Sequence, residues 1–364
     1  MDIYGIDHVE FFVRDARAAA GQLCESYGFR VHGLLGRQTG QPDQSSVLVR
    51  QGDVLMLFTQ GLTAEHAATR YVAQHGDGVA TIALAADEPD GTLAEVVRRG
   101  AVPLPPHPPL EPPAAGSRVR VAAFGDVAHT FVKPGELLAL CAAPDPTPDQ
   151  APVGEPGFLL DAIDHVAACV PTGELASTTA FYQDVLGFTE IFEEYIQVGD
   201  QAMNSRVMQS RSGEVTLTLL EPDALGRPGQ IDEFLKAHDG AGVQHLALRT
   251  GDIATAVRTL SGRGVSFLST PGSYYDELEH RLGKVGVPVE SLRELSILVD
   301  RDSGGELFQI FTRSTHPRRT FFIEVIERLG ARTFGTANIW ALYEAVERER
   351  NRNRCLTPAS PLDQ

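Results

Sequence analysis

An internal repeat constrains the fold of this chain more than any other feature of its 364 residues. Three segments of the first half return in the second half in the same order. They are IDHVEFFV (6–13) and IDHVAACV (163–170), YGFRV (27–31) and LGFTEI (186–191), and GDGVATIAL (76–84) and GAGVQHLAL (240–248). Matches in one order and at similar offsets predict that a structural unit of about 150 residues occurs twice.

A stretch rich in proline, aspartate and glycine separates the two copies, APDPTPDQAPVGEPG at 143–157. Proline fits neither the interior of a helix nor the ladder of a sheet, so this stretch predicts a linker. We therefore expect a first domain at 1–142 and a second domain at 158–364. A further proline-rich segment at 103–113 predicts a loop inside the first domain.

The composition indicates which partners and which cellular compartment to expect for the protein. Apolar residues make up 43% of the chain, which suits a soluble protein with a buried core. A formal net charge of -17 argues against nucleic acid and anionic membranes as partners. No apolar run approaches the ~20 residues of a membrane-spanning helix. The 4 cysteines form no CxxC pair and the N-terminus is unlike a signal peptide, so we expect a cytoplasmic protein with reduced thiols.

Strand and helix patterns alternate in the second half, with hairpins among them. Runs with alternating faces and β-branched residues, such as VTLTLLEP, predict strands, whereas ELASTTAFYQDVLG predicts a helix that ends at Gly187. We expect strands at 203–209, 214–221, 243–249, 265–268, 295–300, 306–312 and 321–326, and helices at 174–187, 230–238, 252–263 and 337–350. This order predicts an α+β fold rather than a doubly wound parallel sheet.

Three residues of the second half suggest a metal site. His165 and His245 lie in strands whose nearest positions on the same face are small or apolar, where a neutral imidazole needs a partner. Glu324 lies in the otherwise apolar strand FFIEVIE, where a buried carboxylate is costly unless it is paired or bound to a metal. Two imidazoles and one carboxylate form the facial triad that suits Fe(II) oxygenases. For each histidine alone, a core position held by a hydrogen bond is the competing interpretation.

The repeat provides an internal comparison for this site. In the first half His8 matches His165, but Thr81 occupies the position of His245. The last strand of the first half has no glutamate where the counterpart of Glu324 is expected. The first half therefore cannot assemble the triad, and we expect it to serve packing or assembly.

Several motifs resemble the family of 4-hydroxyphenylpyruvate dioxygenase and 4-hydroxymandelate synthase, whose vicinal-oxygen-chelate fold is built from βαβββ modules. The segments that carry the resemblance are IDHVAACV, GQIDEFL, GAGVQHLAL, FLSTPGSYYD, ELFQIFT, FFIEVIER and TFGTANIWALYEAVE. The resemblance covers nearly the whole chain and implies tandem modules that form two open, barrel-like domains. It also implies that residues 337–350 form a lid helix that covers the iron and excludes water.

By this resemblance His165, His245 and Glu324 are the catalytic ligands of Fe(II). Phe311 and Phe334 resemble the pair that sandwiches the ring of an aromatic substrate. The polar residues that resemble those near the substrate are Ser205, Thr218, Gln230 and Gln309. The implied partners are a small aromatic 2-oxo acid and dioxygen, and the relatives are commonly dimers or tetramers, so we expect a homodimer or homotetramer.

Both enzymes of this family use 4-hydroxyphenylpyruvate, and the sequence departs from the dioxygenase pattern at its pocket. This chain has LTLLEP where the dioxygenases usually have a stretch like FPINEP. Thr218 therefore occupies the position of a proline, and Leu220 occupies the position of an asparagine. TFGTANI replaces GFGxGNF, so Ile339 stands where a phenylalanine is expected. The smaller Ile339 would let the side-chain carbon of the substrate, rather than its ring, be oxidised. We therefore expect 4-hydroxymandelate and carbon dioxide as products, which implies supply of a hydroxyphenylglycine precursor for a peptide antibiotic.

Three other functions stay open. A dioxygenase of the same family would form homogentisate from the same substrate. An extradiol catechol dioxygenase shares the fold and the triad but needs a further histidine near the iron, and His238, His280 and His316 lie in polar segments. A binding protein of this fold would usually be shorter and lack the triad.

Overall fold

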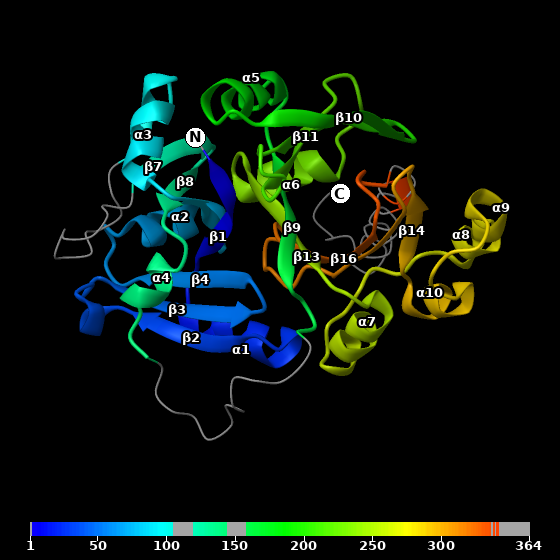
Figure 1. Cartoon of the computed structure of the whole chain (residues 1–364), viewed down its shortest axis with the longest axis horizontal. Helices are drawn as coiled ribbons and strands as arrows, with labels where there is room; N and C mark the ends of the chain where they lie inside the picture. Colours follow the sequence, from blue (N-terminus) through cyan, green and yellow to red (C-terminus); the bar gives the residue numbers. More distant parts are fainter. Residues whose placement is uncertain (1, 105–118, 144–157, 336–337, 339, 342–364) are drawn as a thin grey trace, which may run out of the picture.

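The computed structural model describes residues 2–104, 119–143, 158–335, 338, 340 and 341 (Figure 1). The first half contains β1 (Ile3–Phe12), α1 (Ala16–Tyr27), β2 (Arg30–Leu35), η1 (Arg37–Thr39), β3 (Gln44–Gln51), β4 (Val54–Gly61), α2 (Ala67–His75), β5 (Gly78–Ala86), α3 (Pro89–Arg98), β6 (Pro103–Leu104), β7 (Val119–Phe124), β8 (Val127–Val132) and α4 (Glu136–Leu140).

The second half contains β9 (Ala162–Cys169), α5 (Leu175–Ala180), the π-helical turn η2 (Phe181–Val185), β10 (Thr189–Val198), β11 (Gln201–Gln209), β12 (Thr216–Pro222), α6 (Gln230–His238), β13 (Gly242–Arg249), α7 (Ile253–Gly262), α8 (Gly272–Asp276), α9 (Leu278–Leu282), α10 (Val289–Leu295), β14 (Leu298–Arg301), β15 (Glu306–Phe311) and β16 (Phe322–Leu329). Apart from Ala143, the predicted linker at 143–157 lies outside the described residues, as does most of the predicted helix at 337–350.

Each half forms one 8-stranded sheet, and the two sheets have the same strand order. The first runs β2-β3-β4-β1-β5-β8-β7-β6, and the second runs β10-β11-β12-β9-β13-β16-β15-β14. In both sheets the two central strands are antiparallel to each other and parallel to their outer neighbours. The duplication, the α+β class and the tandem βαβββ modules predicted from the sequence are therefore confirmed.

The central strands are covered on both faces, which explains their apolar composition. All residues of β5 are buried, and in β13 only the last residue, Arg249, is exposed. One continuous cluster of buried apolar side chains includes Val9 and Ile82 of the first sheet together with Val166 and Leu246 of the second. Because the two halves share this core, the first half supports the position of the second.

Glu327 lies on β16 but has a role different from that of Glu324. Its carboxylate accepts a hydrogen bond from the backbone N–H of Ile253 at 2.9 Å. The side chain of Asp252 caps the same helix by accepting from the N–H of Thr255 at 2.9 Å. Two carboxylates at the N-terminus of α7 satisfy backbone donors that the helix leaves free. Glu327 therefore fixes α7 against the sheet.

The segment between α7 and β14 differs from the prediction. The strand expected at 265–268 does not form, and this segment has only an isolated bridge between Phe267 and Thr312. Pro271 follows closely and cannot donate to a ladder. The chain then forms three short helices, α8, α9 and α10, before β14 begins at Leu298. No apolar period of the required length marks these helices, so the sequence did not predict them.

Two equivalent helices meet where the halves join. Helices α2 and α6 each end in a histidine, and the rings of His75 and His238 stack with centroids 4.5 Å apart. The Nδ1 of His75 lies 2.6 Å from the carbonyl oxygen of His238, and its Nε2 lies 2.8 Å from a carboxylate oxygen of Asp126. The junction therefore uses the same helix end from each copy of the repeat.

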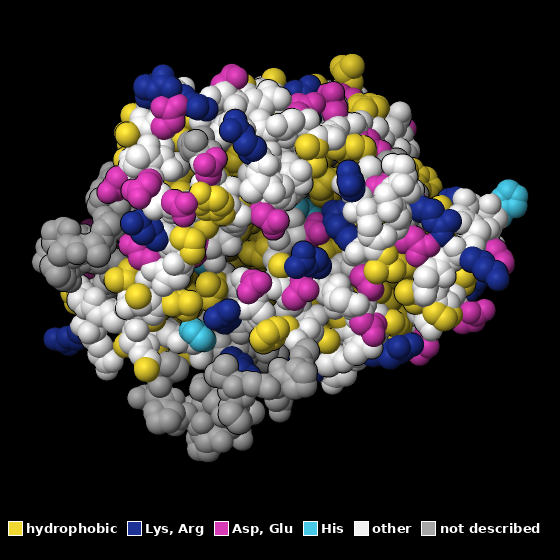
Figure 2. Space-filling model, viewed as in Figure 1, with side chains coloured by type: hydrophobic (Ala, Val, Ile, Leu, Met, Phe, Trp, Pro, Cys, Tyr) yellow, Lys and Arg dark blue, Asp and Glu magenta, His cyan; other side chains and the backbone are white. Residues whose placement is uncertain are grey.

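The surface carries both signs of charge. On the face drawn in Figure 2, Lys and Arg side chains are interspersed with Asp and Glu. No helix in the described part of the chain is long and apolar enough to span a membrane.

His129 gives a testable pH dependence of stability. It is fully buried, its Nε2 lies 2.9 Å from the hydroxyl of Tyr182 across the junction, and burial lowers its pKa to about 4. The unfolded chain takes up this proton first as pH falls below about 6.5, so stability is lost between about pH 6.5 and about pH 4. The loss attributable to His129 is on the order of 2–3 kcal/mol.

Replacing His129→Gln should therefore reduce the fall in the urea midpoint between about pH 7 and about pH 5. His280→Gln, on the exposed side of α9, is the matched control and should leave that fall unchanged. An equal pH dependence in wild type and His129→Gln would contradict the assignment.

Candidate metal centre

Three neighbouring strands bring the predicted ligands to one face of the second sheet. Ala247 of β13 pairs with His165 of β9 on one side and with Glu324 of β16 on the other. His245 lies two residues before Ala247, so its side chain points to the same face. The sheet register therefore brings the two imidazoles and the carboxylate together.

The distances define a compact set of donor atoms. The Nε2 atoms of His165 and His245 lie 3.6 and 3.4 Å from the same oxygen of Glu324, Oε2. One donor atom from each residue lies within 4.8 Å of the others. All three side chains are buried, and Glu324 is only 1% exposed. No lysine or arginine in the described part of the chain forms an ion pair with Glu324, so the buried carboxylate fits a bound cation.

The second nitrogen of each imidazole is held by a side chain. The Nδ1 of His165 lies 2.8 Å from a carboxylate oxygen of Asp164, and the Nδ1 of His245 lies 3.3 Å from the amide oxygen of Gln244. Oxygen acceptors require the hydrogen on Nδ1, which leaves the lone pair of Nε2 free for a metal. Burial lowers the pKa of His245, which favours the neutral form that a metal needs.

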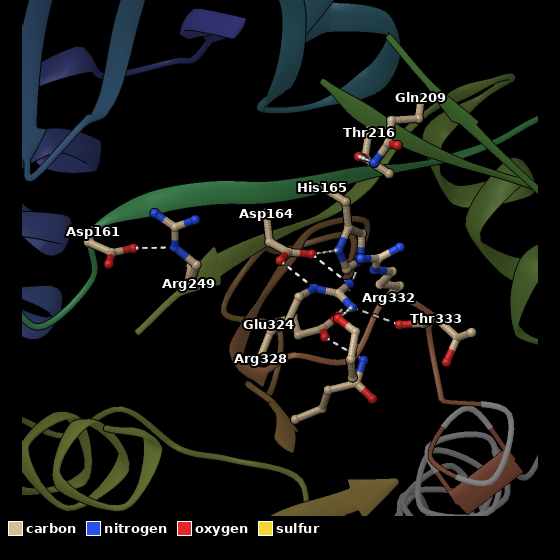
Figure 3. Close-up of polar contacts among 12 residues, drawn as sticks. Asp161, Asp164, His165, Gln209, Thr216, Arg249, Glu324, Arg328, Arg332 and Thr333 are labelled. Atoms are coloured by element: carbon tan, nitrogen blue, oxygen red, sulfur yellow. Dashed lines mark hydrogen bonds and ion pairs between the residues drawn. The ribbon is translucent and has the colours of Figure 1, made fainter. Parts of the chain in front are cut away.

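An arginine fixes the support of His165 (Figure 3). Arg328 donates to both oxygens of Asp164, at 2.7 and 2.9 Å, and its Nη1 donates to the carbonyl of Thr333 at 2.7 Å. Burial would raise the pKa of Asp164, but the hydrogen bonds from His165 and Arg328 hold that pKa well below its usual range. The guanidinium also lies 5.1 Å from the ring centre of Phe334. One side chain thus orients a ligand and an aromatic wall of the site.

The first half has the same backbone positions with different side chains. Ala83 pairs with His8 on one side and with Thr130 on the other, and Thr81 lies two residues before Ala83. Thr81 and Thr130 therefore stand where the second half has His245 and Glu324. Among the described residues, only the second half brings such a group of three histidine or acidic ligands together.

A cavity opens over the three ligands, and all three line it. Six of the residues predicted to bind the substrate line it: Ser205, Thr218, Gln230, Gln309, Phe311 and Phe334. The seventh, Ile339, lies outside the described residues. The cavity brings these side chains to one place, and their roles toward a substrate stay predictions.

Four further residues line the cavity that sequence analysis missed: Phe192, Met203, Ile231 and Gln244. Leu220, which the family comparison already placed at the pocket, lines it as well. The alternation of strand faces could have found Met203, because it lies two residues from Ser205. Phe192 lies on β10, a strand that the sequence did not predict.

Aromatic rings surround the ligands, and one polar group has no partner. Phe334 meets the ring of His165 edge-on at 5.1 Å, and Phe322 stacks on His245 at 4.7 Å. The hydroxyl of Thr218 is buried without a hydrogen-bond partner in the described part of the chain. Such a site can bind an aromatic ligand that carries a hydrogen-bonding group.

Comparisons with known proteins agree with this geometry. Residues 162–279 match the Glyoxalase/Bleomycin resistance protein/Dioxygenase superfamily. The 4-hydroxyphenylpyruvate dioxygenase of Yarrowia lipolytica is 33% identical, with 96% of this chain and 93% of the relative covered, and that of Danio rerio is 32% identical, with 98% and 93% covered. The structure of a triple mutant of 4-hydroxymandelate synthase from Streptomyces coelicolor is 42% identical with a TM-score of 0.84, covering 96% of this chain and 100% of that one.

The fold and the site define a dioxygenase of the vicinal-oxygen-chelate type, a class built on such tandem sheets. Within it, the chain belongs to the 4-hydroxyphenylpyruvate dioxygenase family, because the relatives match over nearly their whole length. The His165, His245 and Glu324 site has the two-imidazole, one-carboxylate donor set that suits a non-haem Fe(II) oxygenase.

Arg328 is expected to act on metal affinity without touching the metal. Arg328→Lys removes the paired hydrogen bonds to Asp164 and loosens His165, so the dissociation constant for Fe(II) should rise roughly tenfold or more. Arg249→Lys is the matched control. It alters a comparable arginine–aspartate pair at the exposed end of β13, where Nε of Arg249 donates to Asp161 at 2.8 Å. Anaerobic Fe(II) titration should show weakened binding in the first variant and unchanged binding in the second; equal affinities would refute this role.

Proposed function

We propose that this protein uses Fe(II) held by His165, His245 and Glu324 to convert 4-hydroxyphenylpyruvate and dioxygen to 4-hydroxymandelate and carbon dioxide. The observation that carries the proposal is a facial triad at the base of a cavity walled by aromatic side chains. The 42% identity to a 4-hydroxymandelate synthase, above the 33% to a 4-hydroxyphenylpyruvate dioxygenase, favours this product.

The iron, when bound, would supply coordination positions for the 2-oxo acid and dioxygen and would pass electrons from the acid to dioxygen during its oxidative decarboxylation. The protein side chains orient the substrate. Phe311 and Phe334 are 4% and 5% exposed and offer ring faces to an aromatic group while keeping water from the site. The unpartnered hydroxyl of Thr218 is available to a polar group of the substrate.

The cavity wall supports attack on the side chain of the substrate rather than on its ring. Both outcomes use the same ligands, so the position of the ring decides between them. Leu220 lines the cavity where the dioxygenase pattern has an asparagine, which removes an amide that could hold the ring hydroxyl. We infer that the ring is held differently here, so that the benzylic carbon is the position that is hydroxylated.

Formation of homogentisate is the second candidate, because the curated relatives that match nearly the whole chain are 4-hydroxyphenylpyruvate dioxygenases. The extradiol alternative is weaker. No third histidine among the described residues lines the cavity, and His238 stacks instead on His75 at the junction of the halves.

We further propose that the second half is the catalytic domain and the first half supports it. A homodimer or homotetramer is the assembly we expect, as an extension of the family resemblance.

The product can be identified directly. The purified protein, loaded with Fe(II) under argon, should convert 4-hydroxyphenylpyruvate in the presence of dioxygen to 4-hydroxymandelate. Because 4-hydroxymandelate and homogentisate are isomers, mass alone does not separate them, and proton NMR of the ring should be used. A ring that keeps its para-disubstituted pattern supports the proposal, and homogentisate as the main product rejects it.

The metal assignment has a matched test in the repeat. His245→Gln should abolish binding of Fe(II), because the triad loses a ligand, whereas His8→Gln, at the first-half counterpart of the ligand His165, should leave the bound iron unchanged. Metal analysis after desalting gives the iron content, and thermal melting shows that each variant is folded. Loss of iron from a folded His8→Gln protein, or full iron in His245→Gln, would contradict the assignment.

A further inference from the structure

A buried chain of hydrogen bonds leads from Glu324 to a residue beyond the last strand. The amide Nε2 of Gln309 donates to Oε1 of Glu324 at 2.8 Å. The amide Nδ2 of Asn338 donates to Oε1 of Gln309 at 2.8 Å, and the hydroxyl of Tyr274 donates to Oδ1 of Asn338 at 3.0 Å. Glu324, Gln309 and Asn338 are 1%, 3% and 0% exposed. Water therefore cannot replace these contacts without rearrangement.

The chain distinguishes the two oxygens of Glu324. Oε2 faces the Nε2 atoms of both histidines, and Oε1 accepts the hydrogen bond from Gln309. A carboxylate held in this way presents one oxygen to a metal rather than two. Single-oxygen coordination keeps a position free, and a 2-oxo acid together with dioxygen requires every position that the three protein ligands leave open.

The orientation of the Gln309 amide decides whether this arrangement holds. An amide has a donor end and an acceptor end, and only the donor end can bind the carboxylate. Asn338 donates to the oxygen of Gln309 and so keeps the NH2 group turned toward Glu324. With the opposite orientation, two oxygens would face each other in a buried site.

Asn338 is itself held in orientation. The Tyr274 hydroxyl accepts from the backbone N–H of Val299 and from Arg281, each at 3.0 Å. The Tyr274 proton lies within hydrogen-bond distance of two acceptors, the carbonyl of Val299 at 2.9 Å and Oδ1 of Asn338 at 3.0 Å, and Arg281 donates to the same carbonyl. Gly335, at φ +71, passes so close that a Cβ there would lie 3.0 Å from Oε1 of Gln309. The backbone beyond Phe334 is thus shaped around the contact between Gln309 and Asn338.

We propose that Asn338 is a positioning residue of the iron site. Through Gln309 it holds Glu324 in single-oxygen coordination, so a residue beyond the last strand completes a site to which it contributes no ligand. The inference rests on the proposed function for the identity of the metal and of the 2-oxo acid. It gives Gln309 a task different from direct contact with substrate, because both ends of its amide are engaged by protein groups.

Asn338→Asp is the sharpest test, because it keeps the shape of the side chain and removes its donor. The new carboxylate can only accept, so Gln309 should turn its NH2 toward it and its oxygen toward Glu324. The dissociation constant for Fe(II) should rise roughly tenfold or more. The visible absorption of the Co(II)-substituted protein, before and after addition of 4-hydroxyphenylpyruvate under argon, should change because the coordination of Glu324 changes.

Tyr274→Phe should also raise the dissociation constant for Fe(II), but by a smaller factor. If Asn338→Asp does not fold, the Fe(II) affinity of Tyr274→Phe tests the inference in its place. Asn204→Asp makes the same chemical change on β11, away from the cavity lining, and should match wild type in both readouts. A folded Asn338→Asp protein with wild-type Fe(II) affinity and a wild-type Co(II) spectrum would overturn the inference. Failure of the wild type itself to bind iron would instead reject the proposed function, so the two failures are distinct.

Discussion

The burial of one carboxylate constrains the rest of this structure. Glu324 lies in the interior beside two imidazoles, a position that is costly for a negative charge unless a cation binds there. Binding a cation there places two demands on the surrounding structure. The sheet register must align the three strands that carry the ligands, and each histidine must keep its hydrogen on Nδ1. Asp164, held by Arg328, accepts from Nδ1 of His165, and Gln244 accepts from Nδ1 of His245. Gln309 binds the second oxygen of Glu324.

The first half shows that the scaffold does not need the metal. Its sheet has the same strand order, and Thr81 and Thr130 occupy the positions of two ligands. A hydroxyl is far cheaper to bury than a charge, so these positions of the first half need no cation while the backbone pairing is the same. The strand order is therefore separable from the donor set, and the shared core and the stacked His75 and His238 join the two halves.

The sequence predicted the features that depend on local pattern. Helix α6 has the predicted bounds of 230–238, and the ligands were recognisable as polar residues in apolar strands. Features that depend on contacts between distant segments were not accessible. The helices α8–α10 have no long apolar period, and the strand expected at 265–268 is replaced by a single bridge. Gln244 is adjacent to a ligand in sequence, yet only the fold reveals that its amide reaches around to His245.

We expect the determinants of the product to lie outside the ligand set. Three identical ligands would serve either outcome, so selectivity must come from groups that position the ring or keep coordination positions free. Both kinds of group lie outside the three strands that carry the ligands: Leu220 on β12, Gln309 on β15, and Phe334 after β16. These positions can vary without disturbing the register of β9, β13 and β16. A family with this architecture can therefore change its product while the iron site stays the same.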